Sequence, residues 1–367
     1  MKILFVGDYS GAHANLRDEL IRKGHEVTLA GGGDGFKGFS SDICLSYQSG
    51  IKLGKKVESA WKAYQLRKMK RYDIVQFINP NPISIYYTPA EIRDLVVSAR
   101  LSVVLLCGCD GSFHQNYGKI SPWLCRQCEE IDNNGRICYL KSNRAYLEYE
   151  KEFYRNINLM IPMDWCYYEM HNTDWEREKS TDLLPMPIVI GEEPCMEIPD
   201  KLRILHPLNR KGFKGTPVIR EAFIELQRRY GDRAEFVIDG RMPYKEYVEL
   251  SKSADIILDQ TYSTSAGMSV LLGMEQGKIT MGGVKEHAIV NAQIQRHKEL
   301  PLLSLGDNVA DIVSNISRVL EMEKKELLAV KRNSRNYVKK YHDVRKVVDT
   351  LLAYYAKGLA DKGEAIM

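Results

Sequence analysis

A short loop of cations and glycines at residues 206–216 is the part of this sequence best suited to chemistry. It has the sequence HPLNRKGFKGT and follows the apolar run LRIL. Arg210 and Lys214 could bind an anion, most simply a diphosphate, through charge-assisted hydrogen bonds. Backbone N–H groups near Gly215, where a helical pattern begins, would add to that attraction. The alternative is a solvated basic turn, which is what most charge runs form.

A second loop, rich in small and hydroxyl residues, strengthens the anion-binding interpretation. In the stretch DQTYSTSAGMSVLLGMEQGK, residues 263–267 separate a strand pattern from a helical one. Small residues let a ligand approach the backbone, and we expect Gly267 to be needed for its missing side chain or for a backbone conformation that favours glycine. An ordinary Ser or Thr helix cap explains one hydroxyl but not the whole run. The two loops together predict a nucleoside diphosphate site formed by Arg210, Lys214, Gly215, Ser263, Thr264, Ser265, Gly267 and Met268.

The elements that must position these loops follow a strand–helix alternation that occurs twice. The first round begins with a strand at 2–8, a helix at 12–23 and a strand at 24–33, which together form a βαβ unit and predict a parallel sheet. Further strands fit 72–78 and 101–109. The second round has strands at 202–208, 234–239, 255–260 and 278–283, helices at 215–231, 244–254 and 267–277, and a helical tail from about residue 308.

The fold class predicted from this alternation is α/β, with two Rossmann-like, doubly wound parallel-sheet domains that face a cleft. We expect an N-terminal acceptor-side domain at 1–195, a C-terminal donor domain at 196–345 and a C-terminal helix at 346–367. The length of 367 residues is ample for two ordinary domains. Ligands of such sheets bind at the carboxyl ends of the strands, where both loops begin.

Composition adds few constraints on partners. With 44% hydrophobic and 27% charged residues and a formal net charge of +4, the chain has the profile of a soluble globular protein. No stretch has the composition of a signal peptide or a membrane span, so we expect a cytoplasmic protein with free thiols. Cysteines gather at Cys107, Cys109, Cys125, Cys128 and Cys138, and CRQC has the spacing of a zinc knuckle. Because a second regular pair is missing, we favour free thiols over zinc and expect no metal and no cofactor.

The order of motifs after residue 200 resembles the donor half of GT-B-fold glycosyltransferases. The motifs are HPLNRKGFKGT, FVIDGRMPYKEYVELSKSADIILDQ and GMSVLLGMEQGK, and they are most similar to those of the large retaining nucleotide-sugar family of bacterial surface-polysaccharide biosynthesis. The resemblance implies that Arg210 and Lys214 hold the donor diphosphate, although their spacing is one residue tighter than usual. It also implies that the loop of Arg241 and Met242 contacts the nucleobase.

One departure from the family pattern concerns its two glutamates, of which the second usually binds the donor ribose. The matching positions hold Thr264 and Leu272, so both carboxylates are missing. Glu275 lies three residues beyond Leu272 on nearly the same helix face, and we expect it to substitute for the second glutamate. A catalytically altered or inactive relative is the alternative.

The N-terminal stretch MKILFVGDYSGAHANLRDELIRKGHEV resembles the acceptor half of the same fold. There a glycine loop, which includes Gly11 here, opens the first helix. Asp110, after the strand at 101–109, is a candidate to orient or deprotonate an acceptor hydroxyl, unless it only caps the next helix. His13 is a second catalytic candidate, with a packed histidine as the alternative.

Residues 51–72 carry many lysines and arginines with Trp61, Tyr64 and Leu66 between them. A basic amphipathic helix of this kind can lie on an anionic membrane surface, where a lipid-linked acceptor would be found. A solvated surface helix is the alternative. Nucleic-acid binding is not expected, because the net charge is modest and no nucleic-acid module is recognisable.

We therefore expect a hexosyltransferase-type enzyme that moves a sugar from a nucleoside diphosphate sugar to a glycan acceptor, and we expect that acceptor to be lipid-linked. The pathway would be capsule, exopolysaccharide or lipopolysaccharide assembly, with the enzyme cytoplasmic or peripheral on the inner membrane face. Two other functions remain open. One is a nucleotide-sugar epimerase of the same fold, and the other is a non-catalytic scaffold that binds nucleotide sugars.

Overall fold

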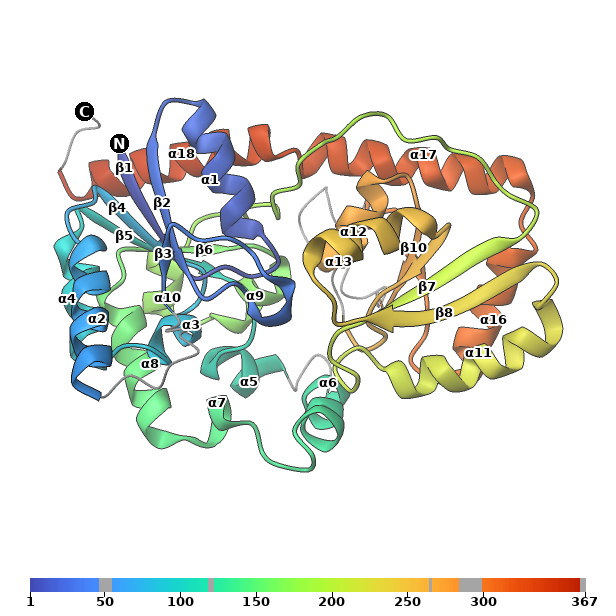
Figure 1. Cartoon of the computed structure of the whole chain (residues 1–367), viewed down its shortest axis with the longest axis horizontal. Coiled ribbons are helices and arrows are strands. Elements are labelled where there is room, and N and C mark those ends of the chain that lie inside the picture. The colour runs from blue at the N-terminus through green and yellow to red at the C-terminus, as the bar shows by residue number, and fades with distance from the viewer. Residues whose placement is uncertain (46–54, 118–121, 264–265, 284–298, 364–367) are drawn as a thin grey trace. The chain divides into compact units, whose positions relative to one another are not determined.

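The computed structural model describes residues 1–45, 55–117, 122–263, 266–283 and 299–363. The contacts divide the chain into two compact units, each built from several chain segments (Figure 1). Unit 1 contains residues 1–115, 139–187 and 344–367, and unit 2 contains residues 116–138 and 188–343. The breaks after residues 187 and 343 lie close to the predicted limits at 195 and 345, but residues 116–138 belong to unit 2 and the C-terminal segment belongs to unit 1.

Unit 1 is built on a six-stranded sheet with the order β3-β2-β1-β4-β5-β6, and every pairing in it is parallel. The central strands are apolar on both faces, as expected for a parallel sheet that helices cover on both sides. The predicted strands at 2–8, 24–33, 72–78 and 101–109 are all present, slightly shorter than expected. The strands are β1 (Lys2–Val6), β2 (Glu26–Gly31), β3 (Ile43–Cys44), β4 (Ile74–Phe77), β5 (Leu101–Leu106) and β6 (Leu159–Pro162).

The helices of unit 1 begin where the sequence supplies helix-start signals. Gly11, with φ 79°, precedes the first helix, and Thr88 and Glu91 form a capping box at another. The helices are α1 (Ala12–Arg22), α2 (Lys55–Lys68), α3 (Pro80–Ser84), α4 (Pro89–Ser98), α5 (Gly111–Tyr117, whose last two residues are counted with unit 2), α7 (Tyr139–Ser142), α8 (Arg144–Asn156), α9 (Trp165–Met170), α10 (Asp174–Lys179) and α18 (Val344–Asp361), with a 3₁₀ turn η1 at Gly35–Lys37.

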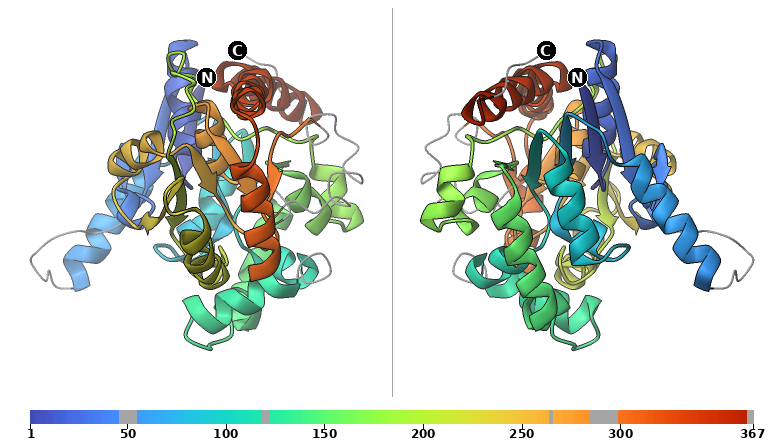
Figure 2. Two further views of the ribbon diagram at one scale, coloured as in Figure 1. Left: turned by 90° about the vertical axis from the view of Figure 1, so that its right-hand side faces the viewer. Right: turned by 90° about the vertical axis from the view of Figure 1, so that its left-hand side faces the viewer.

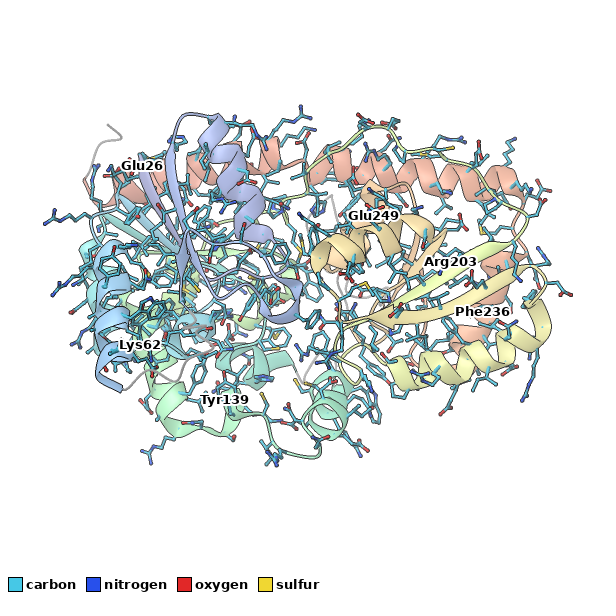
Figure 3. All side chains as sticks on the ribbon, viewed as in Figure 1. Glu26, Lys62, Tyr139, Arg203, Phe236 and Glu249 are labelled. Carbon is cyan, nitrogen blue, oxygen red and sulfur yellow. The ribbon has the colours of Figure 1, made fainter. Side chains whose placement is uncertain are left out.

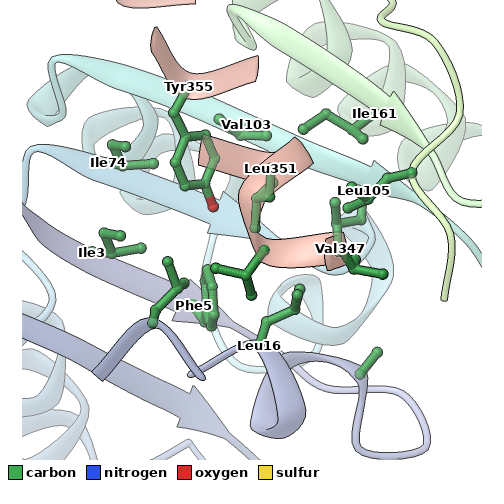
Figure 4. Packing of buried hydrophobic residues seen from close by; sticks show 14 of the residues in the cluster. Ile3, Phe5, Leu16, Ile74, Val103, Leu105, Ile161, Val347, Leu351 and Tyr355 are labelled. Carbon is green, nitrogen blue, oxygen red and sulfur yellow. The ribbon is translucent and has the colours of Figure 1, made fainter. Parts of the chain in front are cut away.

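Helix α18 completes the core of unit 1 although it ends the chain. Val347, Leu351 and Tyr355 are fully buried or nearly so and belong to the same cluster as Phe5 of β1 and Val103 of β5. Figure 4 shows these side chains between the helix and the sheet. The C-terminal helix predicted at 346–367 therefore exists but is part of unit 1, because its apolar face covers that sheet.

Unit 2 has a five-stranded sheet with the order β11-β10-β9-β7-β8, again entirely parallel. Arg203 and Phe236, labelled in Figure 3, lie on the neighbouring strands β7 and β8. The strands are β7 (Leu202–Leu208), β8 (Ala234–Gly240), β9 (Ile256–Leu258), β10 (Ile279–Gly282) and β11 (Leu303–Ser304). The helices are α6 (Pro122–Gln127), the π-helical turn η2 (Cys128–Asp132), α11 (Thr216–Tyr230), α12 (Tyr244–Ser253), α13 (Met268–Glu275), α16 (Val309–Leu320) and α17 (Lys324–Tyr341).

Helix α2 confirms the helix expected within 51–72, and Figure 2 shows it at the outer margin of unit 1. Residues 51–54 of that stretch lie outside the described residues. Tyr64 is 55% exposed and carries the Lys68 ammonium over its ring, at 4.4 Å from the centroid. In the described part of the chain, no helix combines the length and the apolar character needed to cross a lipid bilayer.

Candidate functional site

Lys214 is the second-last residue of the loop that joins β7 to α11. Its Nζ is 3.0 Å from Asp259 Oδ1 and donates to the backbone oxygen of Pro207 at 3.1 Å. Lys214 is only 7% exposed, so this ammonium is held in place rather than solvated. An ammonium has three donors, and these two contacts use two of them. Among the contacts of the described residues, one donor is therefore left for a ligand.

The two predicted loops meet at Gly215. This residue has φ 72° and ends the first loop, and a Cβ built on it would lie 2.1 Å from Thr261 Oγ1 of the second loop. The backbone N–H of Thr261 also donates to the Lys214 oxygen at 3.3 Å. Glycine is required here for both its backbone conformation and its missing side chain. The structure thus brings the cationic loop and the hydroxyl-rich loop into contact.

His206, the fifth residue of β7, forms a hydrogen bond with Thr216, the first residue of α11. Its Nδ1 donates to the Leu258 oxygen at 3.1 Å, which leaves Nε2 to accept the Thr216 hydroxyl at 2.9 Å. Burial, with a smaller contribution from the nearby Lys214 charge, lowers the pKa of His206 to about 3. The ring is therefore neutral, and its two hydrogen bonds link β9 to the N-terminus of α11.

Arg210, the second predicted cation, is half-buried in the same loop. Its guanidinium carbon is 3.9 Å from the centre of the Phe213 ring, and one of its amino groups is 3.1 Å from Cys128 Sγ. The loop therefore presents two cations, one held by Asp259 and the other by an aromatic ring and a thiol.

The hydroxyl-rich loop is described only in part, since Thr264 and Ser265 lie outside the described residues. Ser263 is buried, and Met268 is the half-buried first residue of α13. Gly267, the N-cap of that helix, has φ −80° and ψ 171°, a conformation open to any residue. The expectation of a backbone that only glycine tolerates is therefore wrong. What favours glycine is space, because a Cβ there would lie 3.0 Å from Asp259 Oδ2.

A third loop leaves β8 beside the cationic loop. Leu208 pairs in register with Gly240, so the loop of Arg241 and Met242 begins next to the end of β7. A Cβ on Gly240 would lie 2.3 Å from the Leu208 oxygen, and Arg241 has φ 60°. Arg241 is exposed and Met242 is half-buried. The predicted nucleobase loop is thus at the same sheet edge as the predicted diphosphate loops.

Glu275 binds Arg335 and the backbone of Gly191 through its carboxylate. Its carboxylate and its backbone oxygen both accept from the guanidinium of Arg335 on α17, and the carboxylate also accepts the Gly191 N–H at 3.0 Å. Arg335 is 1% exposed and donates further to the Glu192 oxygen. The structure gives Glu275 a stabilising role between α13, α17 and the chain near residue 191. We therefore do not retain it as a substitute for the missing ribose-binding glutamate.

His13 is a packed histidine. It is fully buried and stacked on Phe5, with Nδ1 2.6 Å from the Gly7 oxygen and Nε2 3.0 Å from Gln76 Nε2. Gln76 in turn accepts the Tyr355 hydroxyl. Burial lowers the pKa of His13 to about 3, so the ring is neutral. Both ring nitrogens are engaged inside the core, which is the packed alternative and not a catalytic position.

Asp110 caps a helix inside a buried network. Its Oδ1 accepts the Phe113 N–H at 2.7 Å, while Oδ2 accepts the Tyr154 hydroxyl at 2.7 Å and lies 3.3 Å from His171 Nε2. On the other side of the ring, His171 Nδ1 lies 3.0 Å from Glu176 Oε1. Asp110 is 1% exposed, so an acceptor hydroxyl cannot reach it without rearrangement. The helix-cap alternative describes Asp110 better than the catalytic one.

The charges of this network follow from its pairing. Burial alone would lower the pKa of His171, but Asp110 and Glu176 raise it to about 9. Burial would raise the pKa of Asp110, and His171 outweighs that effect so that the pKa is lowered. Nearby, burial and then the Asp110 charge raise the pKa of Glu150 to about 8. At neutral pH, an imidazolium between two carboxylates therefore lies beside a protonated Glu150.

Two carboxylates were missed by the sequence analysis. Asp259 directly follows β9 and holds Lys214, and its only signal in the sequence is its place at a strand end. Asp8 follows β1, accepts the His13 N–H through Oδ1 at 2.9 Å and has a buried Oδ2 for which the described residues provide no hydrogen bond. Burial raises the pKa of Asp8 to about 7. Asp8 lies next to Gly11 in the loop that the resemblance assigns to the acceptor.

The cysteines, all within the described part of the chain, are free thiols. Across the described ranges, no group of three or more His, Cys, Asp or Glu side chains is arranged to hold a metal ion. Cys107 is buried against the Ile78 oxygen, and Cys128 contacts Arg210. The cysteine-rich stretch is thus divided between the two units.

Comparison with solved structures identifies the fold. The chain is similar to sucrose-phosphate synthase from Thermosynechococcus elongatus, with a TM-score of 0.65, 13% identity, and coverage of 98% of this chain and 100% of the other. The glycosyltransferase WaaG, involved in lipopolysaccharide biosynthesis, matches with a TM-score of 0.55, 14% identity and coverage of 95% and 99%. The catalytic domain of starch synthase IV from Arabidopsis thaliana, bound to ADP and acarbose, matches with a TM-score of 0.57, 10% identity and coverage of 98% and 99%.

These likenesses show that the chain has the GT-B fold of two Rossmann-like domains, which confirms the predicted fold class. No family model matches the chain, and no curated protein matches it in sequence. At such low identity the comparisons establish the fold, and the chemistry must be argued from the residues of this chain.

Proposed function

We propose that this protein is a glycosyltransferase that moves a sugar from a nucleoside diphosphate sugar to a glycan acceptor. One observation carries the proposal. In a GT-B chain, Lys214 is buried with a donor to spare where the loops after β7 and β9 meet, at the carboxyl edge of the unit 2 sheet. Ligands of open α/β sheets bind at that edge.

The chemistry follows from the charges placed there. The bond between the anomeric carbon and the diphosphate breaks, and the acceptor hydroxyl oxygen bonds to that carbon as its proton passes to the departing phosphate. Lys214, Arg210 and the N-terminus of α11 would stabilise the negative charge that grows on the leaving diphosphate. We propose retention of the anomeric configuration, in line with the sequence resemblance.

Asp259 has a supporting part in this mechanism. Because it accepts one Lys214 proton at 3.0 Å, it fixes the direction of the remaining donor without using it. A buried ammonium and a buried carboxylate compensate each other for the hydration that both have lost. The pair thus holds the Lys214 side chain in one orientation where the two loops meet.

The finer proposal names the acceptor and the remaining contacts. We propose that the loop of Arg241 and Met242 contacts the base, and that Gly11 opens the acceptor side. A lipid-linked glycan of surface-polysaccharide assembly is supported by the sequence resemblance, by the likeness to WaaG and by the exposed basic helix α2. With that acceptor the protein would work at the inner membrane face.

A non-catalytic nucleotide-sugar-binding protein is the second candidate, favoured by one observation. Leu272 of α13 occupies one of the two expected glutamate positions, and Glu275 is bound to Arg335. Such a protein would keep the diphosphate site but lack the carboxylate that usually binds the donor ribose.

A binding screen followed by a turnover assay tests these functions. Nucleotide sugars and free nucleoside diphosphates that bind the native state should raise the melting temperature by mass action. With the donor that binds, a transferase releases some free sugar to water and more nucleoside diphosphate when acceptor is added. An epimerase returns an isomeric nucleotide sugar, and a scaffold leaves the donor intact. If no nucleotide sugar or nucleoside diphosphate binds, the proposal is wrong.

A further inference from the structure

The segment 122–138 belongs to unit 2 although it lies in the N-terminal half of the chain. It comprises α6, the π-helical turn η2 and the turn that follows, and it packs directly on the cationic loop after β7 (Figure 1). No part of this segment had been assigned to the donor side from the sequence. Its contacts with that loop involve Arg210, Gly212 and Phe213, which closely precede Lys214.

Asp132, the last residue of η2, makes the most direct of these contacts. Its Oδ1 accepts the backbone N–H of Gly212 at 3.1 Å, and its Oδ2 accepts that of Phe213 at 2.9 Å. A carboxylate that accepts two consecutive amides with separate oxygens fixes the orientation of that peptide unit. The next residue is Lys214, so this peptide determines where the lysine side chain begins.

Gly212 shows how closely the segment approaches. A Cβ built on this residue would lie 2.1 Å from the Gln127 backbone oxygen and 2.9 Å from the Ile131 side chain. No other residue type fits without moving one of the two backbones. The loop and the segment are therefore packed backbone to backbone.

Arg210 is held by the same segment, through the contact of its amino group with Cys128 Sγ at 3.1 Å. Asp132 lies four positions after Cys128 in the π-helical turn, and the two side chains contact the cationic loop at Arg210 and at Gly212–Phe213. One short helical turn, η2, thus contacts the cationic loop both at Arg210 and just before Lys214.

We infer that η2 positions the two cations for the donor diphosphate, with Asp132 as the positioning residue. The inference rests on the proposed function, since it concerns the same anion. It adds that the Gly212 and Phe213 amides are already bound to Asp132, so the diphosphate is held by side-chain cations and the helix N-terminus rather than by these amides. Asp132 touches neither donor nor acceptor and acts through the loop.

The test compares Asp132→Asn with Glu130→Gln in the full-length protein. Asparagine has the size of aspartate but presents an NH₂ group to one of the two amides, so one N–H loses its acceptor. Glu130 is an exposed residue of the same turn, and its substitution removes the same charge without touching the loop. Asp132→Ala is a second variant that removes both acceptor oxygens.

Three measurements are made on each variant: amide hydrogen exchange, melting temperature, and binding of UDP and ADP in separate titrations. We expect Asp132→Asn to speed exchange in residues 210–216 only, and to weaken binding of the nucleotide that the wild type binds by about tenfold. KM for the corresponding nucleotide sugar should rise to a similar degree. Glu130→Gln should match the wild type in every measurement.

Each outcome is informative. Equal nucleotide affinity in Asp132→Asn, with faster exchange in the loop, would show that Asp132 orders the loop without positioning its cations, and would overturn the inference alone. A weakened affinity shared by Glu130→Gln would also overturn it, because the effect would then be one of charge. If the wild type binds no nucleoside diphosphate, the proposed function fails, and the positioning role fails with it.

Discussion

The carboxyl edges of the two sheets hold similar polar residues in opposite situations. In unit 1, Asp110, His171 and Glu176 are buried, and each charge lies beside one of opposite sign; the Tyr154 hydroxyl also donates to Asp110. In unit 2, Lys214 is also buried, but the Asp259 carboxylate and the Pro207 carbonyl accept only two of its three N–H donors. The difference teaches that burial of charge does not identify a site. A closed set of partners indicates a stabilising network, whereas an incomplete set beside glycine loops indicates a place for a ligand.

The largest effect should come from replacing Lys214, because the comparison depends on the donor that this side chain leaves for a ligand. Lys214→Met removes the ammonium from the leaving diphosphate, and we expect donor turnover to fall by about 10²–10³-fold, as for loss of one charge-stabilising donor. Turnover and nucleotide affinity would be measured in the folded variant.

The control for this change addresses stability, because Asp259 would be left buried without its partner. The double variant Lys214→Met, Asp259→Asn has a neutral pair and should recover most of the melting temperature lost by the single variant. Turnover should stay low in both. Wild-type turnover in the double variant would mean that Lys214 and Asp259 form only a structural ion pair.

The unit 1 network predicts a pH dependence of stability that the donor site should not share. The pKa of His171 is raised from 6.5 to about 9 in the folded protein, so its protonated form stabilises the fold. That contribution is complete below about pH 6.5, decreases as the pH rises towards 9, and corresponds to about 3 kcal/mol. Glu150, whose pKa is raised from 4.5 to about 8, acts in the same direction at lower pH.

Denaturant unfolding of the wild type and of His171→Gln between about pH 6 and about pH 9.5, a range that includes both the ordinary and the raised pKa of His171, would measure this slope. We expect the variant to be less stable at pH 6 and to show a flatter decline above it. Its nucleotide affinity at neutral pH should equal that of the wild type. An altered nucleotide affinity in His171→Gln would show that the unit 1 network influences the donor site in unit 2.

Gly267 offers a smaller and sharper change at the donor site. Its backbone admits any residue, so Gly267→Val should fold, but the new side chain would press on Asp259 and occupy space before α13. We expect nucleotide binding to weaken by at least about tenfold, or ~1.4 kcal/mol. Ser263→Ala should cost less, because water can replace one hydroxyl. Calorimetric titration with melting curves would separate affinity from stability, and normal affinity in folded Gly267→Val would remove the donor site from this loop.

The smallest effect concerns α2, which belongs to neither edge. If this helix lies on an anionic membrane, Lys68→Gln should reduce binding to phosphatidylserine-containing vesicles by about fivefold, since one basic residue contributes ~1 kcal/mol. Sedimentation with anionic and with neutral vesicles would measure it. If the wild type and Lys68→Gln bind equally to anionic vesicles, a solvated surface helix is favoured. Turnover on a water-soluble acceptor should be the same in the two proteins.

The fold could be predicted closely because its signals are local. Buried strands such as 202–208 are continuous apolar runs, and glycines punctuate the helices that follow them. The short strands β3 and β11 were not anticipated, since two residues each provide no periodicity. The placement of 116–138 in unit 2 could not be anticipated either, because it depends on packing against a loop about 80 residues away in sequence.

The meeting of the two loops was predictable from the sequence, whereas the contacts of the individual polar side chains were not. Arg210, Lys214 and Gly215 do meet the second loop, as position at strand ends suggested. Asp110 and His13 were chosen for the same reason and proved to be packed, because sequence cannot reveal which polar atoms are already bonded inside the core. Asp259 was overlooked for the converse reason, since one carboxylate after a strand resembles an ordinary helix cap.

The late position of α18 has a consequence for how the protein is made. Unit 1 draws its first strand from the first residues of the chain and part of its core from Val344 onwards. On a ribosome, that sheet face would stay uncovered while the whole of unit 2 is being synthesised and could fold. The core of unit 1 would therefore be completed only once α18 has been made, later than the core of unit 2, although its first strand is synthesised first. A chain lacking its final helix should accordingly be recognised by chaperones through an apolar face on unit 1, with unit 2 already folded.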